Sequence, residues 1–175
     1  MNRGKRILAV ANCILNANAK ITPYAFYPGA NLAALRPFLE TGAGLLQLPC
    51  PETSYLGLSR WGAAKEQYDV PAFREHCAAI LRAPLLELCA YRDAGYELLG
   101  ILGVNGSPSC GVETTCSGYC GGEIPKNMDA LSRQTENLRM VPGMGVFMEV
   151  LARELARYGL DVPLRGLDED PDGAA

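Results

Sequence analysis

Short apolar segments alternate along the chain with longer segments of helical character, and this alternation restricts the possible folds most. The apolar segments, each the length of one buried strand, are 5–12, 44–50, 97–105 and 161–167. The segments typical of helices are 31–42, 70–96 and the stretch from Gly143 to Leu160. Strands that alternate with helices form a parallel sheet with helices on its faces. The sequence therefore predicts an α/β fold.

Capping residues and prolines refine the limits of these helices. Asn31 is a typical helix cap and Gly42 a typical stop, whereas Pro37 predicts a kink or a late start in the first helix. Pro84 predicts that the long helix is split or bent. The late helix has one apolar face, formed by Phe147, Val150, Leu151, Leu155 and Tyr158. The segments 53–69 and 105–127 lack periodicity, and we expect loops there.

Composition describes a globular chain of one domain. The chain has 175 residues, of which 49% are apolar and 20% charged, with a net charge of −3, so it gives no electrostatic case for nucleic-acid binding. No apolar run approaches the length of a membrane span. The N-terminal apolar run extends only over 7–11, too short for a signal peptide, and we expect a cytoplasmic protein. The domain is predicted to cover 1–167, followed by an acidic C-terminal tail, 168–175.

The chain contains seven cysteines, an odd number in a chain long enough to form a normal core. This argues against a disulfide framework and predicts reduced thiols that serve as core residues, metal ligands or nucleophiles. Cys77 and Cys89 fall on apolar helical positions, and we interpret them as core residues.

Three other cysteines follow three different predicted strands. Cys13 comes after the first strand, Cys50 after the second and Cys110 a few residues after the third. Ligands of open α/β sheets bind beyond the carboxyl ends of the strands. We therefore expect these three thiols to converge at one edge of the sheet.

Converging thiolates are soft ligands for iron–sulfur clusters, zinc or copper(I). Four cysteines usually complete an iron–sulfur site, so three leave one metal position open, which is typical of a catalytic centre. The alternative is that all three are ordinary buried cysteines. The neighbouring residues favour a site, because Cys50 lies between two prolines in PCPE, and Cys110 lies in GSPSCG, where glycines permit close backbone approach.

In these motifs the sequence resembles the thiouracil desulfidase family. The matching features, in chain order, are Cys13 in VANCILN, Cys50-Pro51-Glu52, Ser107-Pro108-Ser109-Cys110-Gly111 and Gly143-Met144-Gly145. The resemblance implies a Rossmann-like three-layer sandwich and a 4Fe-4S cluster held by Cys13, Cys50 and Cys110. It also implies that the fourth iron takes sulfur from a small thiolated heterocycle and releases it as sulfide.

The resemblance also suggests roles for neighbouring polar residues. Ser107 is a candidate catalytic hydroxyl, or alternatively a turn-forming or capping residue. Ser109 is a second candidate catalytic residue, with an orienting role. Glu52 is a candidate general acid or base, or alternatively a carboxylate that accepts amide hydrogens at a helix start. After the CPE motif, Tyr55, Arg60 and Trp61 are suited to a flat ring, or else pack within the loop.

The chain departs from that family at NCILN, at SYLGLSRWG and in two additional cysteines, Cys116 and Cys120. These accessory thiols could carry sulfur, supply a fourth ligand, form a redox pair or belong to the loop without a catalytic role. Only one histidine exists, His76, which we expect to be solvated, so a separate zinc site lacks ligands. The competing hypothesis is a non-catalytic module for sensing or sulfur transfer, in which Cys110, Cys116 and Cys120 hold zinc or an iron–sulfur cluster together with another thiol. A nucleotide-binding domain has little support, because no phosphate-binding motif is present.

Overall fold

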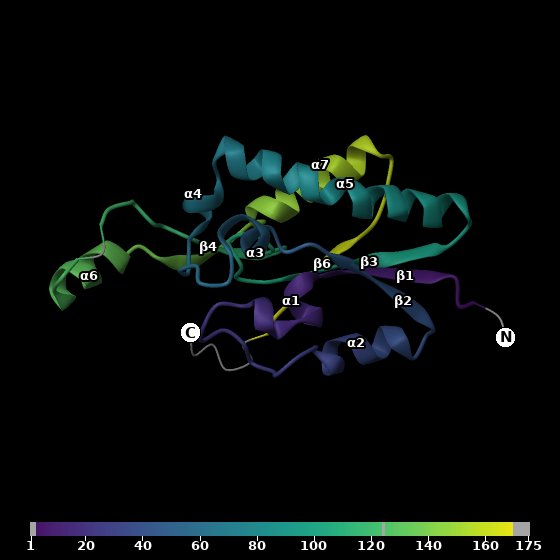
Figure 1. Cartoon of the computed structure of the whole chain (residues 1–175), viewed down its shortest axis with the longest axis horizontal. Helices are drawn as coiled ribbons and strands as arrows, with labels where there is room; N and C mark the ends of the chain where they lie inside the picture. Colours follow the sequence, from purple (N-terminus) through teal and green to yellow (C-terminus); the bar gives the residue numbers. More distant parts are fainter. Residues whose placement is uncertain (1–2, 124, 170–175) are drawn as a thin grey trace.

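A four-stranded parallel sheet forms the centre of the computed structural model, which describes residues 3–123 and 125–169 (Figure 1). Its strands are β1 (Arg6–Ala11), β2 (Ala43–Leu48), β3 (Glu97–Val104) and β6 (Leu164–Leu167), in the spatial order β2-β1-β3-β6. Each neighbouring pair is parallel. The predicted strands and the parallel sheet are confirmed.

Helices cover both faces of this sheet. Ile7 and Ala9 of β1 belong to a core formed with α5 (Pro71–Asp93) and α7 (Val146–Arg157), whereas Leu8 and Val10 point into a second core on the opposite face. The second face carries α1 (Asn12–Leu15) and α2 (Leu32–Leu39) (Figure 1). Burial on both faces is typical of parallel sheets. The three-layer, Rossmann-like α/β sandwich is therefore present as predicted.

Prolines affect the helices less than the sequence suggests. α2 begins directly after Asn31, whose side chain accepts the Ala34 amide at 3.1 Å, so the late start predicted from Pro37 is wrong. α5 continues through Pro84 as one helix of 23 residues and is not split. Leu81 and Leu85 are fully buried on either side of this proline. Packing of the apolar face against the sheet and α7 therefore maintains the helix despite one missing backbone hydrogen bond.

The segment 53–69, predicted as a loop, contains two short helices. These are α3 (Pro51–Leu56) and α4 (Lys65–Tyr68). A further single turn of 3-10 helix covers Ala17–Ala19. Elements of four to six residues are too short to show helical periodicity in sequence, which explains why the prediction was wrong here.

A small two-stranded unit extends from the body; we call residues 114–142 the arm. It comprises β4 (Thr114–Ser117), α6 (Met128–Thr135) and β5 (Arg139–Pro142), and it begins within the predicted loop 105–127. β4 and β5 are antiparallel, with Cys116 opposite Met140. No described residue of α6 is buried, and Figure 1 shows this helix at one end of the molecule, away from the sheet.

All seven cysteines lie within the described ranges, and all are free thiols. Within the same ranges, no helix combines the length and apolar character needed to cross a membrane.

Candidate active site

The carboxyl ends of three adjacent strands bring Cys13, Cys50 and Cys110 together. Cys13 lies in α1 after β1, Cys50 precedes α3 after β2, and Cys110 follows β3; these strands are neighbours in the sheet. The thiols affect one another electrostatically, since Cys13 and Cys50 both contribute to raising the pKa of Cys110. The structure thus places the three cysteines after the carboxyl ends of three adjacent strands, the edge of the sheet at which the sequence predicts them.

Burial raises the pKa values of two of these thiols, Cys13 and Cys110. Burial raises the pKa of Cys13 to about 12, although the nearby Lys20 ammonium opposes this shift. Cys110 is buried, and its pKa is also raised by burial, with further increases from the other two cysteines. Desolvation disfavours an uncompensated thiolate, so these sulfurs are either protonated or held as thiolates by a cation.

Cys50 is fixed at the start of α3. Its sulfur accepts the Thr53 amide hydrogen, with Sγ and N 3.3 Å apart, and thus caps the helix. Pro51 occupies the first helical position, where a missing N–H costs nothing. The PCP sequence therefore sets both the end of β2 and the direction of the thiol.

Cys110 is held by a tight turn whose acceptor is Ser107. The Ser107 hydroxyl oxygen accepts the amide hydrogens of Ser109 at 3.3 Å and Cys110 at 2.9 Å. These two hydrogen bonds correspond to the alternative in which Ser107 forms a turn. Because both amides converge on its oxygen, the side chain retains only its hydroxyl hydrogen for other partners, and Ser109 Oγ lies 3.3 Å away.

Gly145 allows the turn around Cys110 to pack against the start of α7. A Cβ atom on Gly145 would lie 2.5 Å from the Ser109 carbonyl carbon, closer than nonbonded atoms approach. The backbone amides of Val146 and Met148 donate to the carbonyls of Pro108 and Ser109 at 3.0 and 3.2 Å. The glycine-rich segment before the late helix therefore positions the Cys110 turn.

Glu52 connects two segments of the site. Its Oε1 accepts the Ser109 hydroxyl at 2.5 Å, and its Oε2 pairs with Arg60 Nε at 2.9 Å. The Cys50 sulfur, and not the Glu52 carboxylate, accepts an amide hydrogen at the start of α3. These contacts therefore do not match the alternative in which Glu52 caps a helix. Arg60 also donates to the backbone carbonyls of Ala19 and Gly57, so its guanidinium is anchored on several sides.

The structure adds Tyr68, which the sequence did not single out. Its hydroxyl is buried close to the Glu52 carboxylate. Burial raises the pKa of Tyr68, as do the charge of Glu52 and a hydrogen bond to it. No pattern in the sequence distinguishes this tyrosine, because α4 is a single turn and its contact with Glu52 is tertiary.

A second cluster supports the Cys13 side. Tyr27 Oη donates to the Cys13 carbonyl at 3.1 Å and also bonds to Glu169, which pairs with Lys20. The Lys20 and Glu169 side chains are only 8% and 3% exposed. Residues 168 and 169, assigned to the tail in the prediction, are thus engaged with the body, since Asn105 also donates to Asp168. Positions 170–175 lie outside the described residues.

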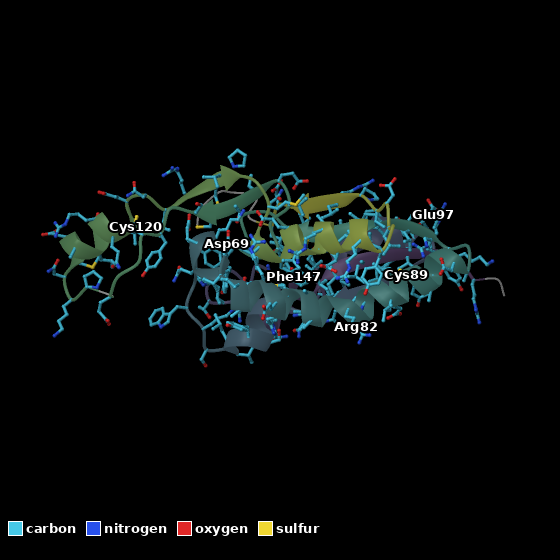
Figure 2. The ribbon with its side chains drawn as sticks, turned by 90° about the horizontal axis from the view of Figure 1, so that it is seen from above. Asp69, Arg82, Cys89, Glu97, Cys120 and Phe147 are labelled. Atoms are coloured by element: carbon cyan, nitrogen blue, oxygen red, sulfur yellow. The ribbon has the colours of Figure 1, made fainter. Side chains whose placement is uncertain are left out.

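The accessory thiols lie elsewhere. Cys116 is partly buried in β4, and Cys120 is exposed on the arm (Figure 2). Burial raises the pKa of Cys116, followed by the charge of Glu66, with no contribution from the three converging thiols. Cys77 and Cys89 pack in or against the core of α5, as predicted. His76, expected to be solvated, is partly exposed, and its Nε2 lies 2.8 Å from the Ser54 hydroxyl oxygen.

The described residues form no compact group of ligands for a single metal ion. Among residues 3–123 and 125–169, no three His, Cys, Asp or Glu side chains are grouped to hold a metal ion. That finding covers Cys13, Cys50 and Cys110 as well as Cys110, Cys116 and Cys120. In an iron–sulfur cluster each cysteine binds a separate iron, so its ligands stand farther apart than ligands of one ion.

Comparison with known proteins yields an archaeal relative. The chain is 34% identical over 110 residues to "Uncharacterized protein MJ0003" of Methanocaldococcus jannaschii, a match that covers 63% of this chain and 70% of the relative. The chain belongs to the same family as this archaeal protein. No family model matches the chain, and no solved structure matches it. The name of the relative gives no activity, so the chemistry must be argued from the site.

Proposed function

We propose that the chain is an iron–sulfur-dependent desulfidase that acts on a small thiolated heterocycle. The observation that carries the proposal is the convergence of Cys13, Cys50 and Cys110 from three adjacent strand ends beside the Glu52–Ser109 hydrogen bond. A core packing role alone does not explain why three thiols meet at the sheet edge where ligands of this fold bind.

The donor set fits the proposed 4Fe-4S cluster chemically. Three soft thiols in a desolvated setting suit iron and sulfide better than hard cations. The thiols have few other partners: Cys50 accepts one amide, and the Ser109 hydroxyl lies 3.5 Å from the Cys110 sulfur. Cys13, Cys50 and Cys110 would hold the cluster, which when bound supplies a Lewis-acidic iron with an open position.

The residues around the thiols supply the proton chemistry. The net reaction exchanges C=S for C=O, with water consumed and hydrogen sulfide released, so no external electrons are needed. Glu52 is the group proposed to take a proton from water and return one to the leaving sulfur. Ser109 and Arg60 orient its two oxygens, and Ser107 maintains the turn and retains one hydrogen to donate.

The test is metal analysis of protein purified without oxygen. We expect iron and labile sulfide in the wild-type chain, loss of both in Cys13→Ser, Cys50→Ser and Cys110→Ser, and retention in the control Cys89→Ser. Cys89 lies on α5 (Figure 2) and packs against the core there. Sulfide release from a panel of thiolated bases then tests the activity. Colourless protein with stoichiometric zinc after anaerobic reconstitution would overturn the proposal.

The non-catalytic metal or redox module makes a different prediction. If Cys110, Cys116 and Cys120 held the metal, the Cys116→Ser/Cys120→Ser double variant would lose it while Cys13→Ser kept it. The proposed desulfidase predicts the reverse, and a cytoplasmic location follows from its need for reduced thiols.

A further inference from the structure

A buried ion pair lies beside Cys13. Lys20 ends the single turn of 3-10 helix, Ala17–Ala19, and Glu169 follows β6; the two side chains are paired and almost fully buried. Removing two charges from water costs about as much free energy as their attraction returns. Stability alone therefore does not explain why this pair is buried next to a residue of the candidate site.

Tyr27 connects the pair to Cys13. Its hydroxyl lies between the Cys13 carbonyl oxygen, 3.1 Å away, and the Glu169 carboxylate, so two acceptors compete for one hydrogen. The ring centroid of Tyr27 is 5.7 Å from Lys20 Nζ, within the range of a cation–π contact. The three side chains therefore form one connected group, attached to the backbone of Cys13.

Cys13 needs such external support, because its own helix is short. The helix α1 has four residues, and a helix of that length is not stable by itself in water. Contacts with other segments must therefore hold it in place. The Tyr27 hydroxyl supplies one of them directly at the Cys13 carbonyl.

The two charges of the pair act on the Cys13 thiol with opposite sign. Burial has the largest influence on the pKa of Cys13 and raises it; the Lys20 ammonium lowers that pKa, and the Glu169 carboxylate raises it. Both charges are therefore close enough to Cys13, in surroundings desolvated enough, to change the free energy of a charge on its sulfur.

A cavity adjoins the same group of residues. Its volume is about 530 Å³, it is formed by residues between Ala17 and Pro28, and both Lys20 and Tyr27 line it. Shortening either side chain would enlarge the cavity and bring water closer to Cys13. Shielding from water is thus the alternative to an electrostatic role, and a test must separate the two.

We propose that Lys20, Tyr27 and Glu169 are positioning residues for Cys13: Tyr27 fixes its backbone, and Lys20 places beside it a buried positive charge that Glu169 partly offsets. The inference rests on the proposed function, because the negative charge that Lys20 opposes is that of cysteine thiolates bound to the cluster. The three residues act through Cys13, and none of them is assigned a contact with the substrate.

The reduction potential of the cluster tests the electrostatic role, because it depends on nearby charge and on solvent exposure. Full-length protein purified without oxygen is titrated with a reductant while its absorption is recorded. Lys20→Met removes a positive charge and should shift the potential to more negative values. Glu169→Gln removes a negative charge and should shift it to more positive values. Shifts in the same direction, or no shift, would overturn this role, because entry of water affects both variants alike.

Glu97→Gln is the matched control for the loss of a paired carboxylate. Glu97 begins β3 and pairs with Arg6 at 2.9 Å, whereas Cys110 follows the other end of that strand. Figure 2 shows Glu97 at the opposite end of the molecule from Cys120. The potential should be unchanged in this variant. A shift equal to that of Glu169→Gln would mean that the net charge of the chain, and not a charge beside Cys13, sets the potential.

Tyr27→Phe tests the fixing of the backbone without any cluster. Amide hydrogen exchange of residues 12–16 is measured by mass spectrometry in metal-free, full-length protein. Loss of one hydrogen bond should make this exchange about fivefold faster. Tyr24→Phe is the control, because Tyr24 is 40% exposed in the same loop, and it should leave the exchange unchanged. Equal exchange in wild type and Tyr27→Phe would overturn the positioning role of Tyr27.

The proposed function and this inference fail in different experiments. Wild-type protein without iron after anaerobic reconstitution would overturn the desulfidase and the electrostatic role together, whereas the exchange measurement would still decide whether Tyr27 positions Cys13. Protein that contains iron and releases sulfide, but whose Lys20→Met and Glu169→Gln variants shift the potential in the same direction, would retain the function and overturn the inference.

Discussion

The Ser109 hydroxyl donates to Glu52 Oε1 at 2.5 Å, and this bond joins the two motifs that carry the candidate site. CPE and SPSCG are 57 residues apart in the chain at these two positions. Arg60 holds the second carboxylate oxygen. The side chain of Glu52 is thus oriented from both sides before any ligand arrives, which is the arrangement that proton transfer at a defined atom requires.

Replacing Ser109 with alanine tests this bond. Loss of the donor leaves one partly buried carboxylate oxygen without its partner, so the free energy of unfolding should fall by about 1 kcal/mol. Sulfide release should fall roughly 100-fold, because a misoriented acid or base loses most of its effect. Urea unfolding and a sulfide assay measure the two effects.

The control for that variant is Ser59→Ala, in the exposed loop that follows α3. It should change neither quantity. Iron content should stay at the wild-type level in Ser109→Ala. Unchanged sulfide release with normal iron would contradict an orienting role of Ser109.

Close packing at Gly145 leads to a second prediction. In Gly145→Ala the added methyl would collide with the Ser109 backbone, which cannot rotate away as a side chain could. We expect a loss of about 3 kcal/mol in unfolding free energy and reduced iron content, since the Cys110 turn is displaced. Thermal unfolding and iron analysis measure these effects.

Gly29→Ala is the matched control, because a Cβ there meets no atom within 4 Å. It should be close to neutral for stability and for iron content. If Gly145→Ala matched this control in both measurements, the packing of α7 against the turn would not position Cys110.

The thiol convergence could be predicted because it depends on features that are local in sequence. Each strand is a short apolar run, each run ends before a cysteine, and parallel strands end at one edge of the sheet. No contact between distant side chains had to be known. The same logic gave both helix layers, although packing overrode the local effect of Pro84.

The remaining features depend on tertiary contacts that leave no periodic signal. Tyr68 of the single-turn helix α4 lies near Glu52 of α3, and Lys20 pairs with Glu169, which is 149 residues away in the sequence. β4 and β5 have four residues each, too few for alternation to be recognised. Sequence therefore located the thiols but not the groups that orient them.

The buried pair of Lys20 and Glu169 leads to a third prediction. Glu169→Gln leaves the Lys20 ammonium without its counter-charge in a desolvated position, and should cost about 3 kcal/mol of unfolding free energy. The double variant Lys20→Met/Glu169→Leu should cost less than Glu169→Gln, because no charge remains to be desolvated. Denaturant unfolding of the two variants decides this, and a larger loss in the double variant would argue against a desolvated pair.

A charge cluster between α4, α5 and α7 predicts a pH dependence of stability. Burial opposes ionisation of Glu149, but hydrogen bonds from Lys65 and Arg74, both at 2.5 Å, outweigh it and lower its pKa below the ordinary 4.5. A lowered folded-state pKa stabilises the fold above the unfolded value. That contribution is therefore complete above about pH 4.5 and is lost as the pH falls through the folded pKa.

Glu149→Gln removes the contribution. At neutral pH the difference in unfolding free energy between wild type and variant should be about 1 kcal/mol, because the site is partly solvated. The difference should shrink as the pH falls below the pKa of an ordinary carboxyl group. Denaturant unfolding across an acidic pH series measures it. If the difference stayed constant or increased at acidic pH, the two cations would not stabilise the ionised form of Glu149, and packing alone would account for its contribution.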